Sequence, residues 1–200
     1  MVKDMSNGQE IKNLFVTPVY GVIIKQDNKK ITNYCNLLVK KIGAGRKRSA
    51  EGGWQSGDLV GDHPPLSNLI STITKHVNKY CSDIQLKKAS LDNIWVNING
   101  YKDSNTRHCH PNALVSGVYY VKTPKQSGQI VLEHPSYDTF GYDWHQGTIK
   151  NFNQYTSARW FIDTQPGKLL LFPGWLNHYV TQNLNKKEER ISISFNYIAK

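Results

Sequence analysis

Cysteine is scarce in this sequence, and long hydrophobic runs are absent. The 200 residues include only three cysteines, Cys35, Cys81 and Cys109, and their odd number and scattered positions do not form a disulfide framework. No apolar run approaches the roughly 20 residues that a membrane-spanning helix needs. The first ten residues, MVKDMSNGQE, contain no apolar segment of the kind found in secretory signals. We therefore expect a cytoplasmic protein that does not span a membrane.

Acidic residues are also under-represented. The 15 Asp and Glu residues stand against 25 Lys and Arg residues, which gives a formal net charge of +10 and attracts phosphate-rich partners. The one dense basic group comprises Lys40, Lys41, Arg46, Lys47 and Arg48, in a glycine-containing stretch that is expected to be a solvated loop. No zinc-finger spacing, phosphate-binding loop or RNA-binding aromatic signature accompanies this group. Nucleic acid is therefore a partner that the charge permits but the sequence does not favour.

What the sequence does contain is typical of one folded domain over residues 1–200. Hydrophobic residues make up 38% of the chain and aromatic residues 11%, which is enough to bury a core without disulfide or zinc support. The first part of the domain, residues 1–92, opens with a β-branched and aromatic segment. This segment predicts a strand over residues 14–25, interrupted near Pro18 and Gly21.

Two helices are expected to complete the first part. Residues 31–42 place apolar side chains near helical spacing, and a second helix is expected to begin at Pro65 and continue to Tyr80. Between them, residues 44–65 are polar and rich in glycine. Loops of this length commonly have a function.

The second part, residues 93–200, consists of short strands separated by turn residues. The expected strands cover residues 93–101, 106–110, 114–122, 128–134, 158–161, 168–172, 178–182 and 189–198. So many short strands in succession are typical of a double-sheet jelly roll. The predicted fold class is mainly β with flanking helices: a double-stranded β-helix (jelly-roll) core with the N-terminal helices packed on one face.

Histidine and arginine supply the residues that could carry chemistry. On an extended backbone residues i and i+2 point to the same side, so His108 and His110 could bind one metal ion while Cys109 points away. His178 lies near the start of a late strand, and Arg190 follows twelve residues later in the alternating strand RISISFNY. Imidazole suits Fe(II), and arginine binds a carboxylate through two parallel hydrogen bonds. Each residue alone has an ordinary structural explanation, but together they meet the requirements of a mononuclear iron site with an anionic cosubstrate.

Several segments match one known family in their order and spacing. They read GGWQS (52–56), WVN (95–97), HCHP (108–111), SGVYYV (116–121), LFPGWLNH (171–178) and RISISFN (190–196). The chain resembles the Fe(II)- and 2-oxoglutarate-dependent oxygenases, and more narrowly a group of these enzymes that is common in bacteria and bacteriophages. The resemblance covers nearly the whole chain, and the combined pattern is far more specific than any single motif.

The resemblance implies a distorted jelly roll that holds iron at its open end. His108 and His178 match the first and last metal ligands of the family, and Arg190 and Ser192 match the pair that binds the distal carboxylate of 2-oxoglutarate. The implied cofactors are Fe(II) and 2-oxoglutarate, with O2 and an unidentified substrate as further partners. Family members couple decarboxylation of 2-oxoglutarate to succinate with C–H oxidation, so a hydroxylase is expected. If the protein is phage-encoded, as the narrower group suggests, it would act in the host cytoplasm.

Position 110 departs from the wider family, which has Asp or Glu there. A carboxylate from elsewhere could complete the metal site, with Glu133, Asp138 and Asp143 as candidates. Alternatively, three neutral imidazoles bind the metal, which leaves the site one unit more positive than two histidines and a carboxylate would. The narrower group carries the HxH pattern itself, so His110 is expected to be the third ligand.

Five further residues are weaker candidates. Asn97, on the expected strand face of Trp95, could contact the cosubstrate, although a half-exposed strand would also explain it. Tyr120 could do the same, although cross-strand packing would also explain it. Trp54 and Ser56, in the long loop, and Asn99, on the strand face of Asn97, are candidates for binding the substrate.

Two other functions fit parts of the same pattern. A three-histidine dioxygenase could oxidise a chelating substrate directly, but it would not need Arg190 and Ser192. A non-catalytic jelly-roll module could bind a polyanion through the net charge of +10, with salt-sensitive affinity, but it would not need the histidines. An Fe(II)- and 2-oxoglutarate-dependent oxygenase would need both the histidines and the pair Arg190 and Ser192.

Overall fold

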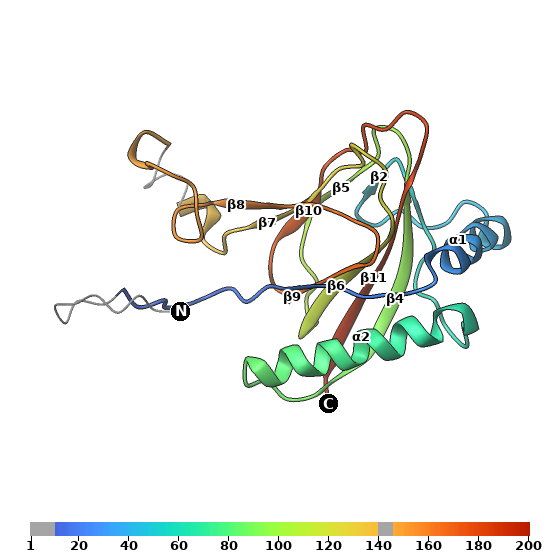
Figure 1. Cartoon of the computed structure of the whole chain (residues 1–200), viewed down its shortest axis with the longest axis horizontal. Helices are drawn as coiled ribbons and strands as arrows, with labels where there is room; N and C mark the ends of the chain where they lie inside the picture. Colours follow the sequence, from blue (N-terminus) through green and yellow to red (C-terminus); the bar gives the residue numbers. More distant parts are fainter. Residues whose placement is uncertain (1–10, 140–145) are drawn as a thin grey trace.

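The computed structural model describes residues 11–139 and 146–200, which form two β-sheets with two helices on one side (Figure 1). The helices are α1 (Asn28–Ile42) and α2 (Pro64–Asp83), with a short 3-10 helix, η1 (Gln146–Thr148). The strands are β1 (Tyr20–Ile23), β2 (Ala50–Glu51), β3 (Trp54–Gln55), β4 (Ala89–Asn99), β5 (Ser104–His108), β6 (Val115–Lys122), β7 (Ile130–Glu133), β8 (Arg159–Ile162), β9 (Lys168–Pro173), β10 (His178–Val180) and β11 (Arg190–Ala199).

The two sheets have the strand order of a jelly roll. The larger sheet runs β1-β9-β6-β11-β4-β3 and the smaller sheet runs β2-β5-β10-β7-β8. Every pairing between neighbouring strands is antiparallel, as between β11 and its neighbours β4 and β6. From β4 to β11 the chain passes repeatedly from one sheet to the other, so residues distant in sequence meet between the sheets. The predicted jelly-roll core is confirmed.

The larger sheet has an apolar outer face and a mixed inner face, because successive side chains of a strand point to opposite sides. On the inner face, polar side chains of β11 lie beside an apolar cluster that includes Val118, Leu170 and Phe172. The outer residues of β11 are all buried in the main hydrophobic core: Ile191, Ile193, Phe195 and Tyr197. The intervening residues of β11, beginning with Arg190 and Ser192, face the smaller sheet. The alternation of polar and apolar residues along β11 therefore places one set of side chains in the hydrophobic core and the other set between the sheets, where they can contribute to a functional site.

Both helices pack on the outer face of the larger sheet, as predicted (Figure 1). The α1 helix contributes its buried positions to the main core, and α2 does the same against β4 and β9. The buried helix residues are Ile31, Cys35, Leu38, Leu66, Leu69, Ile73, Val77, Tyr80 and Cys81. At the start of α1, the Asp27 side chain accepts a hydrogen bond from the backbone N–H of Lys30 at 3.0 Å, which caps the helix.

The structure corrects the sequence-based bounds at two places in the first part of the chain. Of the strand expected over residues 14–25, only Tyr20–Ile23 forms a strand, and the interruption expected near Gly21 is absent because Gly21 pairs with Leu170. Pro18 has no N–H to donate and lies just before this edge strand. The predicted loop over residues 44–65 contains two short strands, β2 and β3, and its last residues already begin α2. These strands extend both sheets, since β2 pairs with β5 and β3 pairs with β4.

No helix within the described ranges is both long enough and apolar enough to span a bilayer.

Gly117 in β6 offers a test of the packing within the larger sheet. A Cβ atom at this position would lie 2.6 Å from the Leu170 carbonyl oxygen and 2.6 Å from the Phe195 ring. We predict that Gly117→Ala lowers the free energy of unfolding by about 1–3 kcal/mol, since neither neighbour can move without disturbing the sheet. The control is Gly21→Ala, where the nearest atom is 3.9 Å away, and we expect a change within about 0.5 kcal/mol. Urea unfolding of both variants checks this, and equal midpoints would contradict it.

Candidate metal centre and adjoining cavity

Two strands of the smaller sheet bring His108 and His178 together. His108 ends β5 and His178 begins β10, and the two residues are direct partners in the antiparallel register. Their ring centroids lie 4.4 Å apart. Together with His110 they form a group whose potential ligand atoms all lie within 4.8 Å of one another. The structure thus assembles the three histidines that the sequence singled out.

The third histidine, His110, lies just beyond the end of β5. Its backbone N–H donates to the Gly174 carbonyl oxygen at 2.8 Å, which ties it to the turn before β10. A Cβ at Gly174 would lie 2.2 Å from the Ala113 carbonyl oxygen, so the close approach of these two turns requires glycine. The His110 ring centroid is 5.0 Å from that of His108 and 5.1 Å from that of His178.

Backbone carbonyls determine which ring nitrogen of His108 and of His178 is available to bind a metal. Nδ1 of His108 contacts the Thr106 carbonyl oxygen at 2.6 Å, and Nδ1 of His178 contacts the Leu176 carbonyl oxygen at 2.9 Å. A carbonyl can only accept, so each Nδ1 carries the proton and each Nε2 has a free lone pair. The carbonyls also hold the rings in the orientation that a metal ligand needs.

Burial keeps the three imidazoles neutral. Burial, with a smaller contribution from the nearby His108, lowers the pKa of His178 to about 3. Burial likewise lowers the pKa of His110 to about 4 and also lowers that of His108. Neutral imidazole is the form that binds a metal, and three such nitrogen donors on one side fit Fe(II) with coordination positions left open.

Neither of the two described carboxylates considered as alternative ligands, Glu133 and Asp138, belongs to the histidine group. The Glu133 side chain is only 2% exposed, but it forms an ion pair with Arg107 and a second with Arg159 at 3.4 Å. Asp138 is exposed, and Asp143 lies outside the described residues. Among residues 11–139 and 146–200, the histidine group contains no carboxylate.

A small cavity, which we call the inner cavity, lies between the two sheets beside the histidines. Its volume is about 50 Å³, and its lining includes His108 and His110 from the metal group. Arg190, Ser192 and Tyr120 line the same cavity from β11 and β6. The tertiary structure therefore places the predicted cosubstrate residues next to the predicted metal ligands.

Arg190 is a buried cation that faces this cavity. It is 1% exposed, and its Nη1 donates to the Ser127 carbonyl oxygen. No ion pair joins its guanidinium to a carboxylate in the described part of the chain. Burial lowers the pKa of Arg190, whereas Tyr120 and Asp103 raise it through electrostatic attraction. Asp103 forms no ion pair with the guanidinium, and a buried charge without a directly paired counter-charge is costly. The arrangement therefore fits an anionic ligand in the inner cavity.

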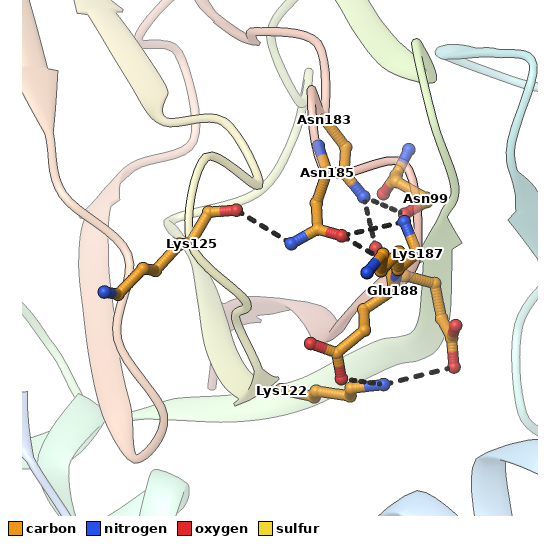
Figure 2. Close-up of polar contacts among 8 residues, drawn as sticks. Asn99, Lys122, Lys125, Asn183, Asn185, Lys187 and Glu188 are labelled. Carbon is orange, nitrogen blue, oxygen red and sulfur yellow. Dashed lines mark hydrogen bonds and ion pairs between the residues drawn. The ribbon is translucent and has the colours of Figure 1, made fainter.

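The loop between β10 and β11 leads directly into Arg190 and is fixed by asparagine side chains (Figure 2). Asn183 is fully buried, and its Nδ2 donates to the carbonyl oxygens of Asn99 at 2.9 Å and Glu188 at 3.0 Å. Asn99 is the register partner of Arg190. The loop is therefore anchored to β4 at the position opposite the arginine.

Asn185 ties the same loop to itself and to the turn after β6 (Figure 2). Its Nδ2 donates to the Lys125 carbonyl oxygen at 3.1 Å, and its Oδ1 accepts from the amides of Lys187 and Glu188, both at 2.9 Å. Lys122 and Glu188 add an ion pair at 3.3 Å. The hydrogen bonds of Asn185 give partners to backbone groups of the loop that strand pairing does not reach. They therefore hold the start of β11 in place.

The other residues predicted to bind the cosubstrate are Ser192, Tyr120 and Asn97, and they differ in how many hydrogen bonds their side chains already form within the protein. Ser192 and Tyr120 are register partners, and burial raises the pKa of Tyr120, so its hydroxyl keeps its proton. Asn97 is largely engaged: its Oδ1 accepts from Gln55 Nε2 at 2.8 Å and its Nδ2 donates to Ser194 Oγ at 2.9 Å. Asn97 therefore holds neighbouring side chains in position at the wall of the cavity.

The three residues predicted for the substrate lie outside the lining of the inner cavity. Trp54 Nε1 donates to the Gly43 carbonyl oxygen at 2.8 Å, and Ser56 Oγ accepts from the backbone N–H of Val96 at 3.0 Å. Both contacts fix the long loop onto the rest of the fold. Asn99 is buried, and its Oδ1 has no hydrogen-bond partner in the part of the chain that the structure describes.

Sequence reasoning missed other lining residues of the inner cavity, among them Ser49, Gln55 and Asn105. Trp95 also lines the cavity, on the strand face that the sequence pattern assigned to it together with Asn97. Ser49 and Gln55 come from the predicted loop, where no periodicity indicates which side chains point inward.

Comparison with protein families gives one match to this chain. Residues 93–196 match the sequence model of the family described as "Putative 2OG-Fe(II) oxygenase". This span includes the three histidines and Arg190. A comparison with curated proteins gave no match.

Solved structures of low sequence identity share the fold. A prolyl-4-hydroxylase from Pseudomonas putida aligns with a TM-score of 0.64 at 11% identity, over 91% of this chain and 92% of that one. The viral collagen prolyl hydroxylase vCPH from Paramecium Bursaria Chlorella virus-1, in a 2OG complex, gives 0.60 at 12% identity, over 91% and 96%. HygX from Streptomyces hygroscopicus, with nickel and 2-oxoglutarate bound, gives 0.61 at 11% identity, over 92% and 84%.

Glu133 provides a test of the histidine-only ligand set. We predict that Glu133→Gln lowers the free energy of unfolding by about 1–3 kcal/mol, because Arg107 and Arg159 lose their buried acceptor. It should still bind one Fe(II) per chain in anaerobic equilibrium dialysis. The control is Glu51→Gln, which removes an exposed carboxylate that accepts from Ser104 Oγ at 3.0 Å. Loss of iron in folded Glu133→Gln, but not in the control, would place a carboxylate in the ligand set.

Proposed function

The chain belongs to the 2OG-Fe(II) oxygenase family of oxidoreductases, and from this membership we propose that it hydroxylates a C–H bond of its substrate. The reaction would convert the substrate, O2 and 2-oxoglutarate into hydroxylated substrate, succinate and CO2. One oxygen atom of O2 enters the hydroxyl group and the other enters succinate. Bound Fe(II) supplies the redox chemistry that activates O2.

In this proposal, His108, His110 and His178 hold the iron. The support is the close grouping of their ligand atoms, within 4.8 Å, and the neutral state of the three rings. The carbonyls that accept from Nδ1 of His108 and His178 direct each Nε2 toward the metal. Three ligands leave coordination positions for a chelating cosubstrate and for O2.

Arg190 is the observation that carries the proposal for 2-oxoglutarate. Its buried guanidinium forms no ion pair with a carboxylate in the described residues, yet it lines a cavity that His108 and His110 also line. A carboxylate of 2-oxoglutarate would supply the missing counter-charge through two parallel hydrogen bonds. The Ser192 and Tyr120 hydroxyls, on the same cavity wall, would donate to the same carboxylate.

An anaerobic titration with 2-oxoglutarate tests this assignment. We predict that the Fe(II)-loaded protein develops a saturable visible charge-transfer band. His178→Ala should lose both iron and band, because one of three ligands is missing. Arg190→Ala should keep the iron but bind 2-oxoglutarate about 30-fold more weakly or worse, as expected when one partner of a buried charge pair is removed.

The control for the arginine is Arg159→Ala, which removes a guanidinium that pairs with Glu133 and does not line the inner cavity. It should bind 2-oxoglutarate like the unmodified protein. Equal affinity of Arg190→Ala and the unmodified protein would refute the role of Arg190. Bound iron without any band would instead favour a dioxygenase that oxidises its substrate without 2-oxoglutarate.

Substitution at position 110 tests the third ligand. We predict that His110→Ala loses stoichiometric iron, whereas His110→Asp keeps iron and still forms succinate from 2-oxoglutarate, because aspartate can replace imidazole as a ligand for Fe(II). Iron content and succinate formation are measured on the same samples. If His110→Ala binds iron as tightly as the unmodified protein, His110 is not a ligand.

A further inference from the structure

A larger cavity, which we call the outer chamber, adjoins the inner cavity. Its volume is about 330 Å³. Five residues line both spaces: Ser49, Gln55, Trp95, His108 and His110. Because two of the shared residues belong to the histidine group, a molecule in the outer chamber would lie beside the proposed iron site. The outer chamber is therefore the space where a substrate could present its C–H bond.

Among the described residues, three charged side chains line the outer chamber, and their net charge is positive: Arg46, Arg48 and Asp58. Arg48 Nη2 donates to Asp58 Oδ2 at 3.1 Å, but the two side chains are 58% and 32% exposed. An ion pair with this exposure is weak. Within residues 11–139 and 146–200, Arg46 forms no ion pair. The chamber thus has one uncompensated guanidinium and a second that is only weakly paired.

The two arginines are held at the chamber by the segment around them. The Arg46 N–H donates to the Gln55 carbonyl oxygen at 2.8 Å, and the Arg48 N–H donates to Gln55 Oε1 at 3.2 Å. Gln55 is itself anchored to β4 through Asn97 at 2.8 Å. Gly57 has φ +72°, and a Cβ there would lie 2.9 Å from Arg46 Cδ, so glycine lets the arginine lie across this position.

We propose that the outer chamber binds the substrate through an anionic group, a phosphate or a carboxylate, which Arg46 and Arg48 hold beside the histidines. This inference rests on the proposed function and names the chemical class of its substrate. Guanidinium groups suit such anions because they form two parallel hydrogen bonds with them. Trp95 lines the same chamber, with its ring centroid 5.7 Å from that of His110, and offers an apolar surface to the rest of the substrate.

Two lysines of the same basic stretch provide a matched control. Lys41 and Lys47 are exposed and line neither the inner cavity nor the outer chamber. Replacing both removes the same number of positive charges as replacing Arg46 and Arg48. If net charge alone governed the binding of an anion, Lys41→Gln/Lys47→Gln and Arg46→Gln/Arg48→Gln would therefore weaken that binding equally.

The test is calorimetric titration of the anaerobic protein, loaded with Fe(II) and 2-oxoglutarate, with phenylphosphonate and with benzyl alcohol. Both probes have an aromatic ring, but only phenylphosphonate is anionic. The unmodified protein and Lys41→Gln/Lys47→Gln should bind phenylphosphonate at least about tenfold more tightly than benzyl alcohol. Arg46→Gln/Arg48→Gln should lose this preference. Benzoate is a third probe, and its affinity relative to phenylphosphonate decides between a carboxylate and a phosphate.

Two results would overturn the anion site: equal phenylphosphonate affinity in the unmodified protein and Arg46→Gln/Arg48→Gln, or no binding up to about 10 mM. The 2-oxoglutarate band is recorded on the same samples and should persist in both double variants, which locates the loss in the outer chamber. If the band is absent in the unmodified protein, the proposed function fails. The same titration on metal-free protein then still decides whether Arg46 and Arg48 bind the anion.

Discussion

The antiparallel pairing of β11 with β4 and β6 is the interaction on which the rest of the structure depends. It buries Ile191 and Ile193 against the helices, and the free energy of that burial fixes the register. Because side chains alternate along a strand, the same register turns Arg190 and Ser192 toward the smaller sheet. A slip of one residue would exchange the two faces, placing an arginine in the apolar core. The hydrophobic core thus positions the polar residues of the site.

The smaller sheet contributes the complementary half of the site. Its pairing of His108 with His178 places two neutral imidazoles beside each other, where burial favours the uncharged form that a metal requires. The nearest buried carboxylate, Glu133, is neutralised by Arg107 and Arg159. Without a carboxylate among the described ligands, bound Fe(II) would keep its full positive charge. Arg190 adds to that field, so the site as a whole favours anionic ligands.

The long segment between the helices connects this site to its surroundings. Its short strands β2 and β3 join different sheets, so the segment passes from the edge of the smaller sheet to the edge of the larger sheet. This path brings Arg46 and Arg48 to the outer chamber, whereas Lys47 between them stays in solvent. A basic stretch that composition alone describes as a solvated loop is thereby divided into residues that line a cavity and residues that do not.

The sequence by itself determined the two helices, most of the strands and the candidate residues of the site, but not β2 and β3. Alternation in RISISFNY predicted both faces of β11, helical spacing predicted α1 and α2, and family resemblance pointed to His108, His178 and Arg190. Only the tertiary structure decided that Glu133 pairs with arginines and that the loop arginines line a cavity. The physical reason is that periodicity is a local property of the chain. Contacts such as Gln55 with Asn97, 42 residues apart, depend on how distant segments pack together.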